Sequence, residues 1–429
     1  MTRLGAVLVA LVAAAVLPAA VLPPVPAAAT PGPRSAPEWW FDSWHIPALW
    51  QAGADGRGIT VAVIDSGVQA DIPELRGKVL PGADFIDNGS DGRTDYDNDE
   101  FSHGTAMASL IAAASGFSDI EGLAPAAKIL PVAVPLDNVV HRGEPPKNAT
   151  ARAIRYAADH GARIISMSLG RPHYERDDQV PCPQAMQDAV LHALAKGALV
   201  VAASGNSGRS GSPVEEPGVC LGVVSVGAVN ARLEVTGFSS RHRYLTVTAP
   251  GSDIPTLTRE SGAAFVGDGT SHATALTSAA LALIWSKYPR ENARQILNRL
   301  LATATDRGVK GRDPSYGVGV IDPAAAIAAG PAVAARANPV LDGAAPLLAL
   351  SRARAAAPKP PAAVARPDAP LGEYRIGIPP EQLDGQFYLL AGGSAGFGAL
   401  ALVLLTVAVR RGRRRLRYRG AGLPLARRS

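Results

Sequence analysis

The strongest constraint on the fold is an alternation of short β-rich runs with helical patterns between residues 36 and 330. The β-rich runs are continuously apolar, as in strands that are covered on both faces. Strands that alternate with helices form βαβ units, which produce an α/β fold with a mostly parallel sheet between layers of helices. We expect strands at 59–65, 128–134, 163–168, 198–203 and 223–229, and helices at 103–115, 150–160, 184–196, 271–286 and 290–303.

Three polar residues stand at the ends of these elements. Asp65 ends an expected strand, and His103 and Ser271 each open an expected helix. Taken singly, they have ordinary structural roles as a turn residue, a structural histidine and a helix N-cap. Together they supply what a hydroxyl nucleophile needs, which is a base to take its proton and an acid to orient the base. The three residues therefore indicate nucleophilic catalysis.

The motifs around these residues resemble those of the subtilisin-like serine proteases, the subtilases, which carry Asp, His and Ser in the same order. The resemblance covers about residues 40–330. It also includes Ser-Met-Ser-Leu-Gly at 166–170, Ala-Ser-Gly-Asn at 203–206 and Ala-Pro-Gly at 249–251. It implies a subtilisin-like three-layer fold and a serine endopeptidase that needs no cofactor.

The resemblance assigns a role to each matched residue. Ser271 would be the nucleophile, His103 the general base and then acid, and Asp65 the residue that orients His103. Asn206 would donate its side-chain amide to the oxyanion, together with the backbone N–H of Ser271. The positive end of the helix that follows Ser271 would add to this stabilisation.

The same resemblance implies a substrate cleft. Ser168, Leu169 and Gly170 would pair with the extended backbone of a protein or peptide substrate. The facing wall would be residues 202–205, which are small and leave room for a substrate side chain.

Both ends of the chain are predicted to be targeting segments. Residues 1–29 resemble a signal peptide cleaved near Ala29, with Ala19-Ala20 as a second candidate and an uncleaved anchor as the alternative. Residues 387–409 carry no charge and are long enough to cross a membrane, with a buried core helix as the alternative. The arginine-rich residues 410–429 would remain in the cytoplasm.

These segments define the remaining domains. Residues 30–330 would be the peptidase domain with a short N-terminal extension, and the Pro- and Ala-rich residues 331–386 an extended linker. The protein would then be a single-pass protein of the cell membrane with its protease domain outside the cytoplasm. There Cys182 and Cys220 should form a disulfide, with two free buried thiols as the alternative.

The charge distribution argues against a nucleic-acid partner. The formal net charge is +5, but residues 410–429 contain nine arginines and no acid. The rest of the chain is therefore mildly acidic and lacks the basic surface that nucleic-acid binding requires.

A narrower resemblance is to the mycosins, the membrane-anchored subtilases of type VII secretion systems. It rests on the signal peptide, the linker and the C-terminal membrane helix. Trp-His-Ile at 44–46 and Gly-Val-Gly-Val-Ile-Asp-Pro at 317–323 add to it. It implies secretion-complex subunits as partners, with processing of secreted substrates or support of the complex as the role. Few residues separate Ala29 from Trp39, so we expect no inhibitory prodomain.

Aspartates crowd one loop in the N-terminal half of the domain. Their spacing does not match an EF-hand, so we expect a solvated acidic loop and no metal, with a calcium site as the alternative. The residues are Asp84, Asp87, Asp91, Asp95, Asp97 and Asp99.

Overall fold

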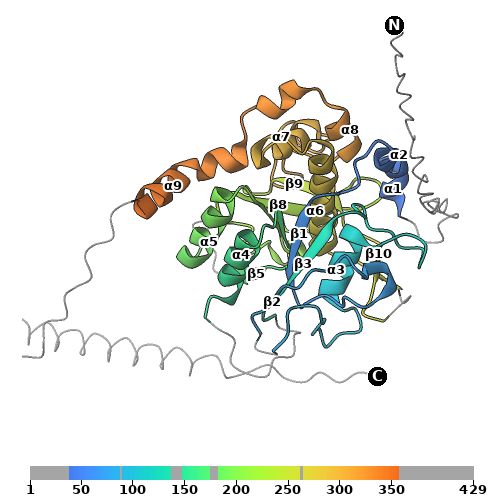
Figure 1. Cartoon of the computed structure of the whole chain (residues 1–429). Coiled ribbons are helices and arrows are strands. Elements are labelled where there is room, and N and C mark those ends of the chain that lie inside the picture. Colours follow the sequence, from blue (N-terminus) through green and yellow to red (C-terminus); the bar gives the residue numbers. More distant parts are fainter. Residues whose placement is uncertain (1–37, 87–88, 137–146, 174–181, 261–263, 357–429) are drawn as a thin grey trace, which may run out of the picture. The chain divides into compact units, whose positions relative to one another are not determined.

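A parallel sheet of seven strands crosses the part of the chain that this computed structural model describes, residues 38–86, 89–136, 147–173, 182–260 and 264–356. The strand order is β2-β3-β1-β4-β6-β8-β9, and all neighbours in it are parallel (Figure 1). The strands are β1 (Thr60–Asp65), β2 (Ala83–Asp84), β3 (Lys128–Ala133), β4 (Ile164–Met167), β6 (Leu199–Ala203), β8 (Val223–Val229) and β9 (Val247–Pro250).

Helices cover both faces of the sheet, as the apolar strands predict. Successive side chains of a strand point to opposite faces. In β1, Val61 and Val63 join one hydrophobic cluster, and Ala62 and Ile64 join the other. The first cluster contains α3 (His103–Ala112), α6 (Thr270–Lys287), α7 (Ala293–Thr303) and α8 (Pro323–Ala328), and the second contains α4 (Ala149–Asp159) and α5 (Gln184–Ala195).

Helix α6 runs through the centre of the first layer. Its side chains from Thr270 to Trp285 are buried all round, and it packs against β4, β6, β8 and β9. A helix that is apolar on every side is expected to be buried in this way. The three-layer α/β prediction is therefore confirmed, and the expected strands and helices are present.

Some elements were not expected from the sequence. Two antiparallel hairpins lie outside the central sheet, one from β5 (Arg171–His173) and β7 (Val214–Glu216), the other from β10 (Ile254–Leu257) and β11 (Ala264–Gly267). Helix α3 ends at Ala112 rather than at residue 115 because Ala113 is extended. Single 3₁₀ turns lie at Pro73–Leu75 and Gly208–Ser210.

The N-terminal extension is part of the core. It forms α1 (Trp39–Ser43) and α2 (Ile46–Gln51). Trp40, Phe41 and Ile46 are fully or almost fully buried in the cluster that contains α3 and α6. Removing these large apolar side chains from water stabilises the fold.

The expectation of an extended spacer from residue 331 is wrong for residues 331–356. A 3₁₀ helix covers Pro331–Ala335, and α9 covers Pro339–Ala356. The buried Asn298 of α7 donates to the carbonyl oxygens of Ala334 and Arg336, at 3.0 and 2.6 Å, and accepts from the side chain of Asn338 at 2.7 Å. These hydrogen bonds hold residues 334–338 against α7. The segment is therefore folded onto the domain, although its Pro- and Ala-rich composition predicts an extended spacer.

The predicted targeting segments lie outside the described residues. These are the signal peptide (1–29), the membrane segment (387–409) and the tail (410–429), together with the linker beyond residue 356. Among the residues described, no helix has both the length and the apolar character that crossing a bilayer requires.

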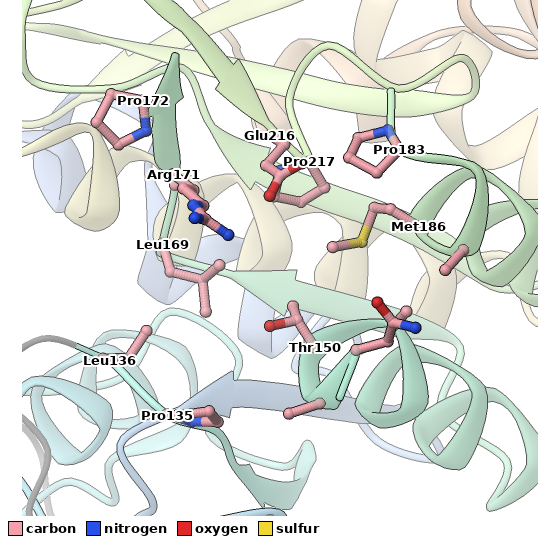
Figure 2. A pocket seen from close by; sticks show the side chains of 15 residues that line it. Pro135, Leu136, Thr150, Leu169, Arg171, Pro172, Pro183, Met186, Glu216 and Pro217 are labelled. Carbon is pink, nitrogen blue, oxygen red and sulfur yellow. The ribbon is translucent and has the colours of Figure 1, made fainter. Parts of the chain in front are cut away.

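A cavity of about 700 Å³ opens between α4, α5 and the β5–β7 hairpin (Figure 2). Leu169, Arg171, Met186 and Glu216 line it, together with several prolines. It borders the segment that the sequence assigns to substrate binding.

Candidate active site

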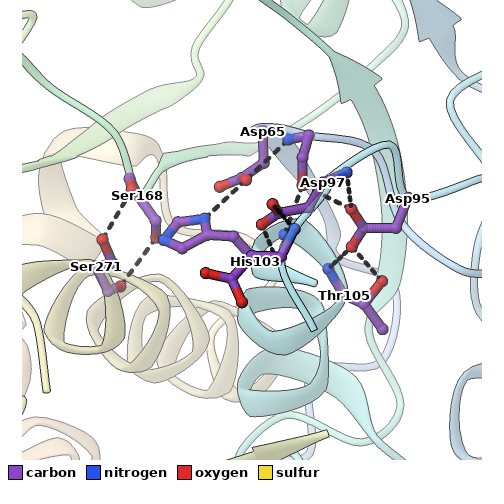
Figure 3. Close-up of polar contacts among 10 residues, drawn as sticks. Asp65, Asp95, Asp97, His103, Thr105, Ser168 and Ser271 are labelled. Atoms are coloured by element: carbon purple, nitrogen blue, oxygen red, sulfur yellow. Dashed lines mark hydrogen bonds and ion pairs between the residues drawn. The ribbon is translucent and has the colours of Figure 1, made fainter. Parts of the chain in front are cut away.

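Asp65 and His103 form a buried pair at the carboxyl end of β1. Asp65 is fully buried, and its Oδ1 lies 2.8 Å from Nδ1 of His103 (Figure 3). The backbone N–H of Ser66 donates to the same Oδ1 at 2.8 Å. A carboxylate at Nδ1 fixes the imidazole so that its Nε2 faces the other way, ready to accept a proton.

A close backbone approach brings these two residues together. Gly104 follows His103, and a Cβ atom built on it would lie 1.9 Å from the carbonyl oxygen of Gly67. Only glycine allows α3 to start so close to the end of β1.

The acidic loop orients the start of α3. Asp97 accepts a hydrogen bond from the backbone N–H of His103 at 2.9 Å, and Asp95 accepts one from the backbone N–H of Thr105 at 2.8 Å. Between them, the backbone N–H of Gly104 donates to Oγ of Ser66 at 2.9 Å. These are N–H groups that a helix leaves without a partner in its first turn. The loop predicted to be a solvated acidic segment therefore has buried carboxylates that hold the catalytic candidate His103 in place.

Asp95 is buried at the centre of this arrangement. Its carboxylate also accepts from the hydroxyls of Ser66 at 2.8 Å and Thr105 at 2.5 Å. Burial raises the pKa of Asp95 even though these hydrogen bonds oppose the change.

Negative charge also acts on the imidazole. Burial alone would lower the pKa of His103, but the charge and hydrogen bond of Asp65, aided by Asp95 and Asp97, outweigh it. The pKa of His103 is therefore raised above its usual value of 6.5.

Ser271 lies in the first turn of α6, beside Ser168, which follows β4. The hydroxyl of Ser271 donates to the carbonyl oxygen of Ser168 at 2.9 Å, and the hydroxyl of Ser168 donates to the carbonyl oxygen of Ser271 at 2.9 Å. In Figure 3 the ring of His103 points from Asp65 toward this pair of serines. The structure thus brings the three predicted catalytic residues to one end of the sheet, with the serine hydroxyl bonded to a backbone carbonyl.

The side chain of Asn206 has a defined orientation. Its Oδ1 accepts from the backbone N–H and the hydroxyl of Thr270, each at 2.9 Å. Because a backbone N–H can only donate, the oxygen must face Thr270 and the amide nitrogen must face away. That leaves the NH₂ of Asn206 available as a donor next to the nucleophile candidate.

The predicted substrate-binding segment continues from Ser168. Leu169 lies partly buried against the cluster of α4 and α5, and Gly170 is exposed. β5 follows directly and pairs with β7, with Arg171 opposite Glu216.

Sequence reasoning missed Glu215, whose side chain reaches this segment. A Cβ atom on Gly170 would lie 2.8 Å from Oε2 of Glu215, and one on Gly205 would lie 2.4 Å from Oε1. Burial raises the pKa of Glu215 to about 7. The only sequence signal was an acid close to the Gly205-Asn206 motif, which does not show where its side chain points.

His272 is a second histidine at the site that the sequence did not single out. It is buried next to Ser271, and burial, with the nearby charge of His103, lowers its pKa to about 3. It therefore stays neutral and does not compete as a base. The ring of Phe101 lies against His103 and His272, with centroids at 5.6 and 5.7 Å, and against Phe265 at 4.8 Å.

The two cysteines are joined. Cys182 and Cys220 form a disulfide, as predicted, with Cα atoms 4.9 Å apart. The bond connects Cys182, two residues before α5 begins, with the turn before β8.

The described part of the acidic loop shows no cluster that could hold a metal. Across the described residues, no three His, Cys, Asp or Glu side chains converge suitably. Asp87, one of the candidates, lies outside them.

Comparison with known proteins now identifies the family. The sequence model of the subtilase family, Peptidase_S8, matches residues 56–319, more than half of the chain. The chain belongs to the subtilase family of serine proteases.

Curated relatives support this membership. Subtilisin DY of Bacillus licheniformis is 35% identical over 276 residues, which are 64% of this chain and 92% of the relative. Subtilisin E of Bacillus subtilis (strain 168) is 36% identical over 282 residues, 65% of this chain and 68% of the relative. This subtilase is therefore similar to subtilisins across its catalytic domain.

Solved structures point to the mycosins. The MycP3 protease from the type VII (ESX-3) secretion system superimposes with a TM-score of 0.57 at 31% identity, covering 68% of this chain and 88% of that one. MycP1 from Mycobacterium smegmatis gives 0.58 at 27%, covering 69% and 88%. A chain in the periplasmic assembly from the ESX-5 inner membrane complex gives 0.60 at 26%, covering 77% and 89%.

Proposed function

We propose that this subtilase is a membrane-anchored serine endopeptidase that uses Asp65, His103 and Ser271 as its catalytic triad. The observation that carries the proposal is the 2.8 Å contact between the buried Asp65 and Nδ1 of His103, whose ring points toward Ser271. A carboxylate in this position selects the tautomer that can act as a base.

The reaction would begin with attack by Ser271 Oγ on the carbonyl carbon of the scissile peptide bond. The hydroxyl rotates away from Ser168, and its proton passes to Nε2 of His103, while Asp65 stabilises the imidazolium. Collapse of the intermediate breaks the C–N bond, and His103 gives its proton to the amine that leaves. Water then attacks the acyl-enzyme with the same base, and the carboxyl product leaves.

Two donors would stabilise the negatively charged tetrahedral oxygen. One is the NH₂ of Asn206, which is oriented by the bonds from Thr270 to its carbonyl. The other is the backbone N–H of Ser271, at the positive end of the 18-residue helix α6. Loss of one such side-chain donor lowers turnover by about 10²–10³-fold in subtilisin.

The setting of the reaction is also part of the proposal. The signal peptide (1–29), peptidase domain (30–330, with helices that continue it to 356), linker, membrane segment (387–409) and basic tail (410–429) would place the protease outside the cytoplasm. The similarity to type VII secretion proteases supports an association with such a complex.

The similarity to a component of an assembled inner membrane complex favours a second role. The chain would support a secretion complex structurally, with proteolysis secondary. The two roles make different demands on Ser271, because a scaffold does not need its hydroxyl.

Labelling with a fluorophosphonate probe tests the triad. The full-length protein in detergent should be labelled at Ser271, and Ser271→Ala and His103→Ala should lose the label. Asp159→Ala, at an exposed carboxylate that ends α4 before the start of β4, is the control and should label like the unchanged protein. Absence of labelling in the folded, unchanged protein would refute an assembled nucleophile.

A further inference from the structure

Basic side chains gather on three loops of the domain. The loops are residues 207–212, which follow β6, residues 237–245, between β8 and β9, and residues 306–315, between α7 and α8. They contain two acidic residues, Asp306 and Asp313, and six exposed basic residues, which we call the basic patch: Arg209, Arg241, Arg243, Arg307, Lys310 and Arg312. The net charge of the chain does not reveal this local concentration of cations.

Hydrogen bonds hold the three loops side by side. The backbone N–H of Arg241 donates to Oγ of Ser212 at 3.0 Å, which connects the second loop to the first. The guanidinium of Arg312 donates to the carbonyl oxygen of Leu245 at 3.0 Å, which connects the third loop to the second. The basic patch is therefore one continuous surface.

Within the described residues, no ion pair neutralises the basic patch. Arg57 and Arg232, elsewhere on the surface, each pair with a carboxylate close by. Of the two acids in the loops, Asp313 is buried and accepts from two backbone N–H groups, and Asp306 accepts from the backbone N–H of Gly311. Cations held close together repel one another, and an anionic surface would relieve that repulsion.

An apolar side chain stands among these cations. Val309 is 74% exposed and lies between Arg307 and Lys310 in the third loop. The loop turns tightly on both sides of it, because Gly308 and Gly311 have φ values of +77° and +86°, which favour glycine. A valine held in water in this way would be removed from water if it entered the interface of a bilayer.

We propose that the basic patch and Val309 dock the domain on a membrane that contains anionic lipids. The inference rests on the proposed membrane anchor and adds a second contact with the same bilayer. The cations would lie against the lipid headgroups, and Val309 would enter the interface between them. An acidic protein would satisfy the cations but offers no apolar phase to the valine, so the two features together favour a lipid surface.

A membrane anchor would make this contact easy to form. Residues 357–386 would connect the domain to the predicted membrane segment, a span of at most about 100 Å when fully extended. A surface that is tethered to its partner meets it at a high effective concentration, so weak contacts are sufficient. Each Lys or Arg near an anionic membrane strengthens binding about fivefold, within a distance of about one Debye length.

A fluorescent label at position 309 tests the docking in the full-length protein. Val309→Cys adds a free thiol to a chain whose two native cysteines form the disulfide, and this thiol is labelled with the environment-sensitive dye NBD. In nanodiscs of phosphatidylcholine with about 30% phosphatidylglycerol, the NBD emission should be at least about twofold higher than in discs of phosphatidylcholine alone, because the dye leaves water. A label at Phe117→Cys, a position that is 60% exposed and outside the three loops, should give equal emission in both discs.

Neutralising the basic patch should release the domain from the membrane. Three substitutions added to the labelled protein should lower the ratio of docked to free domain about 100-fold and so remove the rise in emission: Arg243→Gln, Arg307→Gln and Lys310→Gln. The matched control makes the same charge change on or just before α4 and should keep the rise: Lys147→Gln, Arg152→Gln and Arg155→Gln. Salt at about 1 M should also remove the rise, because it shortens the Debye length to about 3 Å.

Three results would overturn the inference. They are emission that ignores the anionic lipid, a rise that survives neutralisation of the basic patch, and an equal rise at Phe117→Cys. If the label ignores the lipid but responds once the discs also carry the other membrane proteins of the cell, the surface instead binds an acidic protein.

Failure of the proposed function would be recognised separately. If the chain does not co-elute with the discs in size-exclusion chromatography, the proposed anchor is wrong. The labelled proteins are then mixed with vesicles of the same two compositions, where the same responses are expected and a silent label would overturn the inference. Fluorophosphonate labelling reports on the triad alone, so its failure would leave the docking surface in place.

Discussion

At the residue scale, the surroundings of His103 change the pKa of its imidazole, and with it the pH range in which the side chain can act as a base. A base must be neutral to accept the proton of Ser271, and the negative charges around it raise its pKa above 6.5. The protonated, inactive form therefore persists to higher pH than for a free histidine. Activity should fall as the pH falls through this raised pKa.

We expect Asp97→Asn to move the acid limb of the kcat/KM profile to lower pH. The variant removes one negative charge near His103. Its amide oxygen can replace Oδ2 as the acceptor of the His103 N–H, at the loss of the bond that Oδ1 accepts from the Asp99 N–H. The profile should be measured with an uncharged peptide substrate, so that ionisation of the substrate does not contribute. An exposed change at the end of α4, Asp159→Asn, should leave the limb in place, and an unmoved limb in Asp97→Asn would contradict the electrostatic account.

At the element scale, α9 shows how a composition that predicts a linker can form part of a domain. A sequence rich in Ala and Pro does not by itself indicate where the segment packs in a fold. Its position comes from Asn298 and Asn338, which lie 40 residues apart in sequence and hydrogen-bond to each other while buried. A hydrogen bond between residues so far apart in sequence leaves no periodic pattern from which it could be predicted.

Ending the chain at residue 330 should destabilise the domain relative to a chain that ends at residue 356. Asn298 would lose three hydrogen bonds and leave polar atoms unpaired, at a cost of about 1–3 kcal/mol. The melting temperature should fall by several degrees, measured by thermal unfolding. Adding Asn298→Ala to the shorter chain should recover part of the loss, because no polar group remains to be paired. Equal melting of the two lengths would show that α9 does not support the domain.

The sequence was sufficient for elements and residues whose signals are local. Asp65, His103 and Ser271 stand at the ends of strongly patterned elements, so their location at the carboxyl end of the parallel sheet could be predicted. Glu215 could not be found in this way, because its position depends on the pairing of β5 with β7 and on two glycines of other segments.

At the scale of the whole molecule, the question is whether a secretion complex needs the reaction or only the fold. Asp65 and His103 are paired, and the ring of His103 points toward Ser271, so the fold carries the parts that the proposed cleavage needs. If proteolysis is the main role, Ser271→Ala should abolish secretion of the processed substrates in cells that lack the native gene. Full rescue by Ser271→Ala would instead favour structural support. Equal membrane levels of both proteins, measured by immunoblot, are the necessary control.

The disulfide closes a ring of chain that contains several secondary-structure elements. Between Cys182 and Cys220 the chain forms α5, passes through β6, presents Asn206 and then turns into β7 with Glu215. One covalent ring thus carries both the proposed oxyanion donor and the buried acid that lies between Gly170 and Gly205. Opening that ring should loosen the positions of both residues together, so a reducing environment would lower turnover and stability at the same time.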